Sequence, residues 1–201
     1  DSAVAEGQQV TGMIASDLEI RVRLFWSTGT AFPQVTQGSP PPDAAAVRAH
    51  IEAGFARLKV PRIDLVMIPA SNPSFVTSTL PTVLGVLKQL KQEGRIRYIG
   101  ATEIPTPNNP YATLETLMRS EPIDFIGVPH YHMGNRSAEE TLLPLAQERK
   151  IGVAVYMPFQ LGRLFQRAGT TPLPEWAAEF DARTWAQFFL KYIVSHPAVT
   201  M

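Results

Sequence analysis

The chain has 201 residues, of which 45% are hydrophobic and 18% are charged, a balance that excludes a disordered chain or a fibre. Lysine plus arginine equals aspartate plus glutamate at 18 each, so no net charge attracts nucleic acid or an anionic membrane. Cysteine is absent, which excludes disulfides, thiolate nucleophiles and cysteine-ligated metals. No apolar stretch approaches the ~20 residues of a membrane span. We therefore expect one soluble domain, residues 1–201, with no nucleic-acid or membrane partner, in either the cytoplasm or the periplasm.

Short β-rich runs alternate with helical periodicity along the chain. Helices that pack on a sheet are predicted by two apolar stripes, Val47 to Leu58 and Leu80 to Leu90. Near-continuous apolar runs predict strands buried on both faces of a parallel sheet, at 21–28, 63–68, 96–101, 123–131 and 151–157, with another opening at Val199. Proline and glycine predict loops at 32–43 and 160–174. Alternating strands and helices indicate either a doubly wound sheet or a (β/α)8 barrel.

Five segments, in collinear order, resemble the aldo/keto reductase superfamily. They are Arg57–Val60 running into Ile63–Leu65, then Gly94–Gly100, Glu121–Phe125, Leu142–Ala146 and Ser195–Thr200. The resemblance extends over nearly the whole chain. It implies an α/β fold, a (β/α)8 TIM barrel with its active site at the carboxyl ends of the strands. It also implies a barrel clipped at both ends, since the chain would begin at the end of the second barrel strand and stop within the eighth.

Such enzymes reduce carbonyls with NADPH, using an aspartate, a tyrosine, a lysine and a histidine. The tyrosine donates a proton to the nascent alkoxide, the lysine lowers the tyrosine pKa, the aspartate orients the lysine, and the histidine positions the carbonyl. By resemblance Asp1 keeps the aspartate, whereas Glu6, Gly29 and Pro69 replace the other three residues. Ordinary reduction is therefore expected to be disabled, and Glu6 is the candidate substitute for the tyrosine.

The cofactor positions implied by the resemblance are partly retained. Thr102 and Glu103 stand where the family commonly holds the nicotinamide carboxamide with serine and asparagine. Tyr156 matches the aromatic residue that stacks on the nicotinamide ring, and Gly162 and Leu164 match the loop beneath the pyrophosphate. The resemblance thus implies NADPH as the cofactor, held in part by Thr102, Tyr156, Gly162 and Leu164.

A second hypothesis is a different enzyme on the same barrel. His130 and His132 alternate along a predicted strand, so both side chains are expected to project from one strand face. With Glu103, Glu6 and Asp1 they offer acid/base groups for a cofactor-independent lyase, isomerase or hydrolase. Glu103, His130 and His132 are also weak candidate ligands for zinc, manganese or non-haem iron, although no metal is expected.

A third hypothesis is a non-catalytic binding or scaffold protein, because barrels host many functions and only the site can distinguish them. Each hypothesis includes a small-molecule substrate or ligand. If the barrel is truncated, its open strand edges predict pairing with a second copy of the chain as a homo-oligomer.

Overall fold

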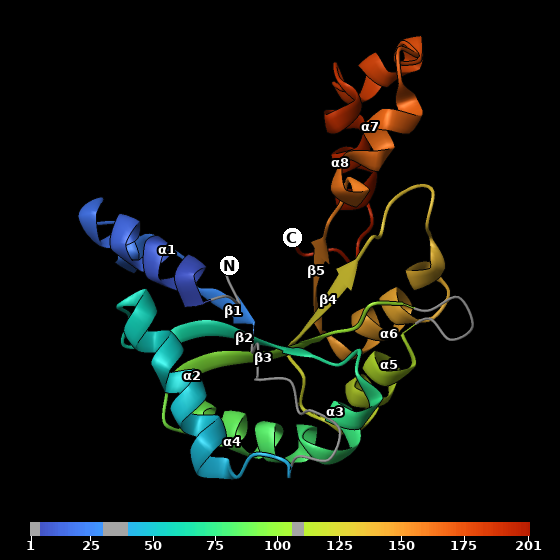
Figure 1. Cartoon of the computed structure of the whole chain (residues 1–201). Coiled ribbons are helices and arrows are strands. Elements are labelled where there is room, and N and C mark those ends of the chain that lie inside the picture. Colours follow the sequence, from blue (N-terminus) through green and yellow to red (C-terminus); the bar gives the residue numbers. More distant parts are fainter. Residues whose placement is uncertain (1–4, 30–39, 106–110) are drawn as a thin grey trace. The chain divides into compact units, whose positions relative to one another are not determined.

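The structure is a computed structural model that describes residues 5–29, 40–105 and 111–201 (Figure 1). Its contacts divide the chain into two compact units, Asp1–Ala101 and Thr102–Met201. The single domain expected from the sequence stays a prediction. In the three described ranges, no helix is both long enough and apolar enough to cross a membrane.

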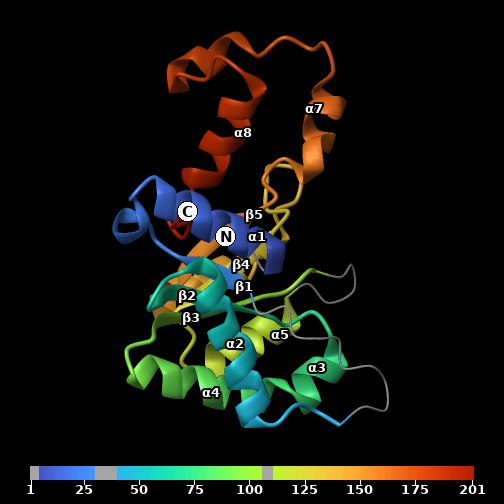
Figure 2. The ribbon, with the colours of Figure 1, turned by 60° about the vertical axis from the view of Figure 1, so that its left-hand side comes forward.

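The first unit contains a sheet with helices packed against it. Its elements are α1 (Ala5–Asp17), η1 (Arg21–Arg23), β1 (Ser27–Gly29), α2 (Ala44–Leu58), β2 (Ile63–Pro69), α3 (Pro73–Ser78), α4 (Leu80–Gln92) and β3 (Ile96–Thr102), whose last residue falls in the second unit. Strand β1 pairs in parallel with β2, with Ser27 opposite Leu65, and β3 lies next to β2. Helices α1 and α2 pack against each other (Figure 2).

Helix α2 shows how the sequence determines these elements. The Asp43 carboxylate accepts a hydrogen bond from the Ala46 N–H and caps the helix start. Lys59 adopts a left-handed conformation, with φ of 54°, and ends the helix. The predicted stripe from Val47 to Leu58 is buried, as is β2 from Ile63 to Ile68, which confirms both predictions.

The strand predicted at 21–28 is wrong over most of its length. Residues Arg21–Arg23 form η1, and β1 contains only Ser27–Gly29. The Arg23 N–H bonds to the Ile20 carbonyl, and the Trp26 N–H bonds to the Asp64 carboxylate. Because turn and side-chain acceptors take these backbone donors, they do not join a strand ladder.

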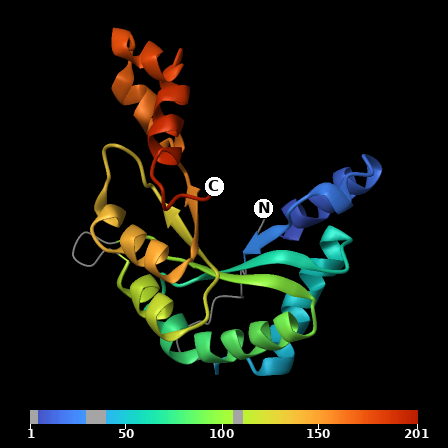
Figure 3. The ribbon, with the colours of Figure 1, turned by 180° about the vertical axis from the view of Figure 1, so that it is seen from behind.

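The second unit is organised around two parallel strands. Its elements are α5 (Ala112–Ser120), β4 (Phe125–Pro129), η2 (Ser137–Glu139), α6 (Leu142–Arg149), β5 (Gly152–Tyr156), η3 (Gln160–Gly162), α7 (Arg163–Ala168), η4 (Glu175–Phe180) and α8 (Trp185–Val194). The β4–β5 register runs from Phe125 opposite Gly152 to Pro129 opposite Tyr156. Helices α5 and α6 pack side by side (Figures 1 and 3). Val199 makes an isolated parallel bridge to Val153, where a strand start was predicted.

The loop predicted at 160–174 contains helix α7. Gly162 directly precedes this helix with φ of 88°, and Gly169 directly follows it with φ of 53°. The glycines therefore delimit a short helix instead of marking a continuous loop. In the other predicted loop, residues 32–39 lie outside the described residues, and 40–42 contain no helix or strand.

Candidate functional site

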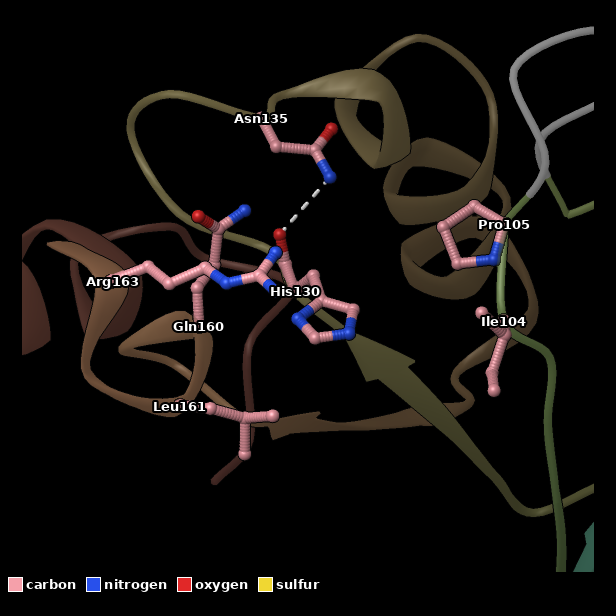
Figure 4. Close-up of a pocket in the computed structure, with 7 residues that line it drawn as sticks. All are labelled: Ile104, Pro105, His130, Asn135, Gln160, Leu161 and Arg163. Atoms are coloured by element: carbon pink, nitrogen blue, oxygen red, sulfur yellow. Dashed lines mark hydrogen bonds between the residues drawn. The ribbon is translucent and has the colours of Figure 1, made fainter.

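A cavity of about 380 Å³ lies in the second unit, where the chain leaves the carboxyl ends of β4 and β5 (Figure 4). Its walls combine apolar and polar side chains, a composition typical of small-molecule sites. The residues that line it are Ile104, Pro105, His130, Asn135, Gln160, Leu161 and Arg163. Parallel strands commonly place binding residues at this end.

His130 is held in the cavity wall by its main chain. Its N–H donates to the Tyr156 carbonyl at 3.0 Å, and its own carbonyl accepts from the Asn135 Nδ2 at 3.1 Å (Figure 4). Its φ of 60° is left-handed, and β4 ends at Pro129. The Nδ1 atom is buried without a hydrogen-bond partner among the described residues. A buried polar atom without a partner requires an explanation, and a ligand in this cavity is one.

Arg163 brings a positive charge to the same wall. Its side chain is exposed, lines the cavity, and extends toward His130 in Figure 4. In the described part of the chain, no carboxylate lies within ion-pair distance of it. The N–H groups of Gly162 and Arg163 bond to the carbonyls of Phe159 and Gln160. An anion here would therefore meet the Arg163 side chain more readily than the loop amides.

Thr102 and Tyr156, both predicted as cofactor residues, are brought together over Gly127. The Thr102 hydroxyl donates to the Gly127 carbonyl at 3.1 Å. A Cβ atom at Gly127 would lie 2.6 Å from the Tyr156 ring and 2.9 Å from the Thr102 Cβ. Both side chains are half-buried. Glycine at position 127 is thus what gives them room.

The other two predicted cofactor residues differ in position. Gly162 stands between the cavity-lining residues Leu161 and Arg163. Leu164 is 5% exposed and is not among the residues that line the cavity. Sequence reasoning missed Arg163, Asn135 and Gln160. Arg163 could have been found from the sequence, because it directly follows Gly162, which the resemblance had already selected.

Glu103 and His132 are both engaged in local structure. The Glu103 Oε2 accepts from the Leu114 N–H at 2.9 Å, at the positive end of the α5 dipole. His132 is 1% exposed, and its Nδ1 accepts from the Gly134 N–H at 3.0 Å. Burial lowers the pKa of His132, and the charges of Arg167 and His130 lower it further, which favours the neutral ring.

The expectation that His130 and His132 project from one strand face is wrong, because β4 ends at Pro129 and the left-handed His130 breaks the alternation. Among the described side chains, no three histidines or carboxylates are grouped as metal ligands. Glu103, His130 and His132 all belong to the second unit.

The four positions that the resemblance assigns to the family tetrad, which stay predictions, fall in the first unit. Asp1 lies outside the described residues. Gly29 and Pro69 are the last residues of the paired strands β1 and β2, so they share one end of the sheet. Glu6 is exposed in the first turn of α1. Two residues later, the buried Gln8 donates to the Thr28 hydroxyl at 2.8 Å, which ties the start of α1 to the end of β1.

Comparisons with known proteins agree on one family. The model described as the Aldo/keto reductase family matches residues 37–201. The NADH-specific methylglyoxal reductase of Escherichia coli (strain K12) is 33% identical over 120 residues, 59% of this chain and 35% of that protein. Probable aldo-keto reductase 1 of Glycine max is 32% identical over 145 residues, 70% of this chain and 37% of that protein. The aligned parts thus amount to little more than a third of these relatives.

Solved structures give the fold of the chain. An aldo/keto reductase from Klebsiella pneumoniae, in complex with NADP and acetate, superposes with a TM-score of 0.71 at 22% identity, over 98% of this chain and 66% of that one. The holo form of aldo-keto reductase AKR11C1 from Bacillus halodurans superposes with a TM-score of 0.61 at 25% identity, over 84% of this chain and 50% of that one. The fold is therefore that of the matched part of a (β/α)8 barrel, as the sequence predicted.

Proposed function

Because the chain belongs to the aldo/keto reductase family, we propose that the cavity of its second unit binds a nicotinamide nucleotide, NADPH foremost, and that ordinary carbonyl reduction is lost. One observation carries the binding proposal. A cation without a carboxylate partner, Arg163, and a buried imidazole nitrogen without a partner, on His130, line one cavity among the described residues. An anionic ligand with hydrogen-bonding groups would satisfy both.

The chemistry of the lining suits such a nucleotide. The Arg163 guanidinium would hold a phosphate oxygen, while His130 and the Gln160 amide would bind polar groups of the ligand. Ile104 and Leu161 offer apolar contact for a ring. When bound, a reduced nicotinamide supplies the hydride for carbonyl reduction. The Klebsiella pneumoniae relative, solved with NADP, supports this choice of ligand.

Loss of ordinary reduction follows from the first unit. Hydride addition to a carbonyl leaves an alkoxide that needs a proton. By resemblance the donor and its partners should stand at Glu6, Gly29 and Pro69, and neither glycine nor proline has a side-chain proton to give. Glu6 remains the candidate donor.

The alternative acid/base or metal-assisted enzyme has less support from the site. The Glu103 carboxylate bonds to the start of α5, and the His132 ring is buried against Gly134. The Glu103 carboxylate is therefore already used in the fold, and the His132 ring, 1% exposed, presents no surface to a substrate. A non-catalytic protein that binds the nucleotide is compatible with the proposal.

The test is a titration of the full chain with NADPH and NADH, followed by nicotinamide fluorescence. We expect saturable micromolar binding of NADPH, weakened about five- to tenfold in Arg163→Gln, because one charged hydrogen bond contributes about 1–1.5 kcal/mol. Arg183→Gln removes an exposed charge of the same unit outside this cavity and should leave the affinity unchanged.

Reduction is assayed with methylglyoxal, the substrate in the name of the Escherichia coli relative. We expect no turnover above background. Absence of binding at millimolar concentrations of both nucleotides would contradict the binding proposal. Turnover comparable to that of a relative with an intact tetrad would contradict the loss of reduction.

A further inference from the structure

A second cavity, of about 690 Å³, lies within the first unit and is strongly basic. It is found at the amino ends of the strands, since Trp26 precedes β1 and Asp64 and Arg97 are the second residues of β2 and β3. Gly29 and Pro69 stand at the other ends of their strands. This cavity therefore lies at the opposite strand ends from Gly29 and Pro69, and it shares no lining residue with the cavity of the second unit. Its cationic lining residues are Arg21, Arg23, Lys59, Arg62 and Arg97.

The carboxylate in this lining, Asp64, balances only one of those charges. Asp64 is 7% exposed, and its Oδ2 accepts from the Trp26 N–H at 2.8 Å. Its Oδ1 accepts from the Arg97 Nη1 at 3.1 Å. Asp64 thus bonds to two residues that line the cavity, and it neutralises the charge of one of them, Arg97.

The remaining cations have no acidic partner within the described ranges. Arg21 donates to the Lys59 carbonyl at 2.9 Å, a bond that fixes the guanidinium but leaves its charge unbalanced. Arg23, Lys59 and Arg62 are exposed, and no carboxylate of the described residues pairs with them. Like charges gathered around one cavity repel one another, and a multivalent anion would relieve that repulsion.

An exposed aromatic ring borders the same cavity. Phe25 lines it and is 48% exposed. Its ring stacks on Tyr98 at 6.3 Å between centroids, and the Arg97 guanidinium lies 5.1 Å from the Tyr98 ring centroid. The stack fixes one face of Phe25, and its exposed surface is available to a planar ligand group. Stacking on such rings is a common way to hold a nucleobase.

We infer that this cavity binds a nucleotide with a di- or triphosphate chain. The phosphates lie among Arg21, Arg23 and Arg62, whose guanidinium groups match phosphate oxygens in geometry and charge, and the base stacks on Phe25. The chain has no net charge, and its excess positive charge is confined to one cavity. That distribution favours a short anionic ligand over nucleic acid. The inference does not depend on nicotinamide binding in the second unit.

Calorimetric titration of the full chain with ATP, and separately with inorganic tripolyphosphate, tests this. We expect saturable binding of both, weakening as salt is added. The double variant Arg23→Gln, Arg62→Gln removes two exposed charges without an acidic partner, so the fold should persist, and both affinities should fall about tenfold or more. The double variant Lys150→Gln, Arg183→Gln removes the same charge from exposed positions of the second unit and should change neither.

Phe25→Ala separates the nucleotide from a bare polyphosphate, because we expect it to weaken ATP binding and leave tripolyphosphate binding unchanged. Absence of saturable ATP binding, or an affinity that the Arg23→Gln, Arg62→Gln variant leaves unchanged, would overturn the inference. So would equal ATP affinity in Phe25→Ala, which would indicate a site for phosphate alone. Loss of ATP binding in Arg163→Gln, with the first-unit variants unaffected, would assign ATP to the second unit instead.

Discussion

Gly127 is a single position on which the arrangement of Thr102 and Tyr156 depends. In Gly127→Ala the added Cβ would meet the Tyr156 ring at 2.6 Å, so the ring must move. We expect a loss of about 1–3 kcal/mol in the free energy of unfolding, as in other overpacked sites. Urea denaturation measures this. Gly85→Ala in α4 is the control, because its Cβ meets no atom within 4 Å and helix propensity predicts a gain of about 0.5–1 kcal/mol. Equal effects of the two substitutions would contradict the account.

Glu139 is a charged residue whose protonation should be visible in stability. Its carboxylate accepts hydrogen bonds from Arg136, from the Tyr131 hydroxyl at 2.9 Å and from the Tyr192 hydroxyl at 3.0 Å. The Arg136 bond is the largest cause, and with the tyrosines it lowers the pKa of Glu139 to about 2, against the opposing effect of burial. A carboxyl with a lowered pKa stabilises the fold above its ordinary value of 4.5 and loses that contribution as pH falls toward 2.

We therefore expect the free energy of unfolding to fall between about pH 4.5 and pH 2, by about 2 kcal/mol for this group. Glu139→Gln should lower stability at pH 7 and flatten this part of the profile. Denaturant unfolding over a pH series makes the comparison. A variant that keeps the slope of the unchanged chain would show that Glu139 does not contribute to it.

At the residue scale, the structure places some of the residues selected by resemblance close together, while their role in cofactor binding stays a prediction. The resemblance selected Thr102 and Tyr156, which contact the same glycine, and Gly162, which stands inside the cavity-lining segment. It failed for His132, because alternation holds only within a strand. The chain leaves β4 before His130 through a left-handed residue, and histidine composition gives no sign of that turn.

Among the helices, α5 shows a carboxylate acting from outside the helix it stabilises. Its N-cap residue, Tyr111, makes no side-chain capping bond, whereas Glu103 accepts from the Leu114 N–H. Glu103→Ala should cost about 1 kcal/mol of unfolding free energy, the usual value of a lost cap, and Glu103→Gln should restore part of it through its amide oxygen. Thermal unfolding of both variants measures this. Unchanged stability in Glu103→Ala would contradict the capping role of this carboxylate and would favour the acid/base hypothesis.

Helices and strands were predicted correctly where a regular pattern of apolar residues extends along the element, and wrongly where a turn interrupts the chain. The apolar stripe of α2 and the apolar run of β2 are both buried as predicted. In each case the pattern extends over the whole element. Residues 21–28 have the composition of a strand, yet Arg21–Arg23 form η1 and the Trp26 N–H donates to the Asp64 carboxylate. That long-range bond has no signature in the local pattern.

At the scale of the whole molecule, equal numbers of acidic and basic residues conceal an uneven distribution. The total of 18 against 18 predicts no net long-range field, but five cations and one carboxylate line the first-unit cavity among its described residues. Composition cannot reveal this, because the contributing residues come from η1, the turn after α2 and β3. The barrel fold itself was predictable through the resemblance of the collinear segments, and the superposition on solved aldo/keto reductases confirms it.

The bond from the His130 N–H to the Tyr156 carbonyl uses only main-chain atoms. Any residue except proline can form its donor side, and any residue can form its acceptor side. The Tyr156 side chain can therefore be exchanged without removing this bond, whereas the left-handed backbone at position 130, with φ of 60°, restricts that position to residues that tolerate it, such as asparagine or glycine.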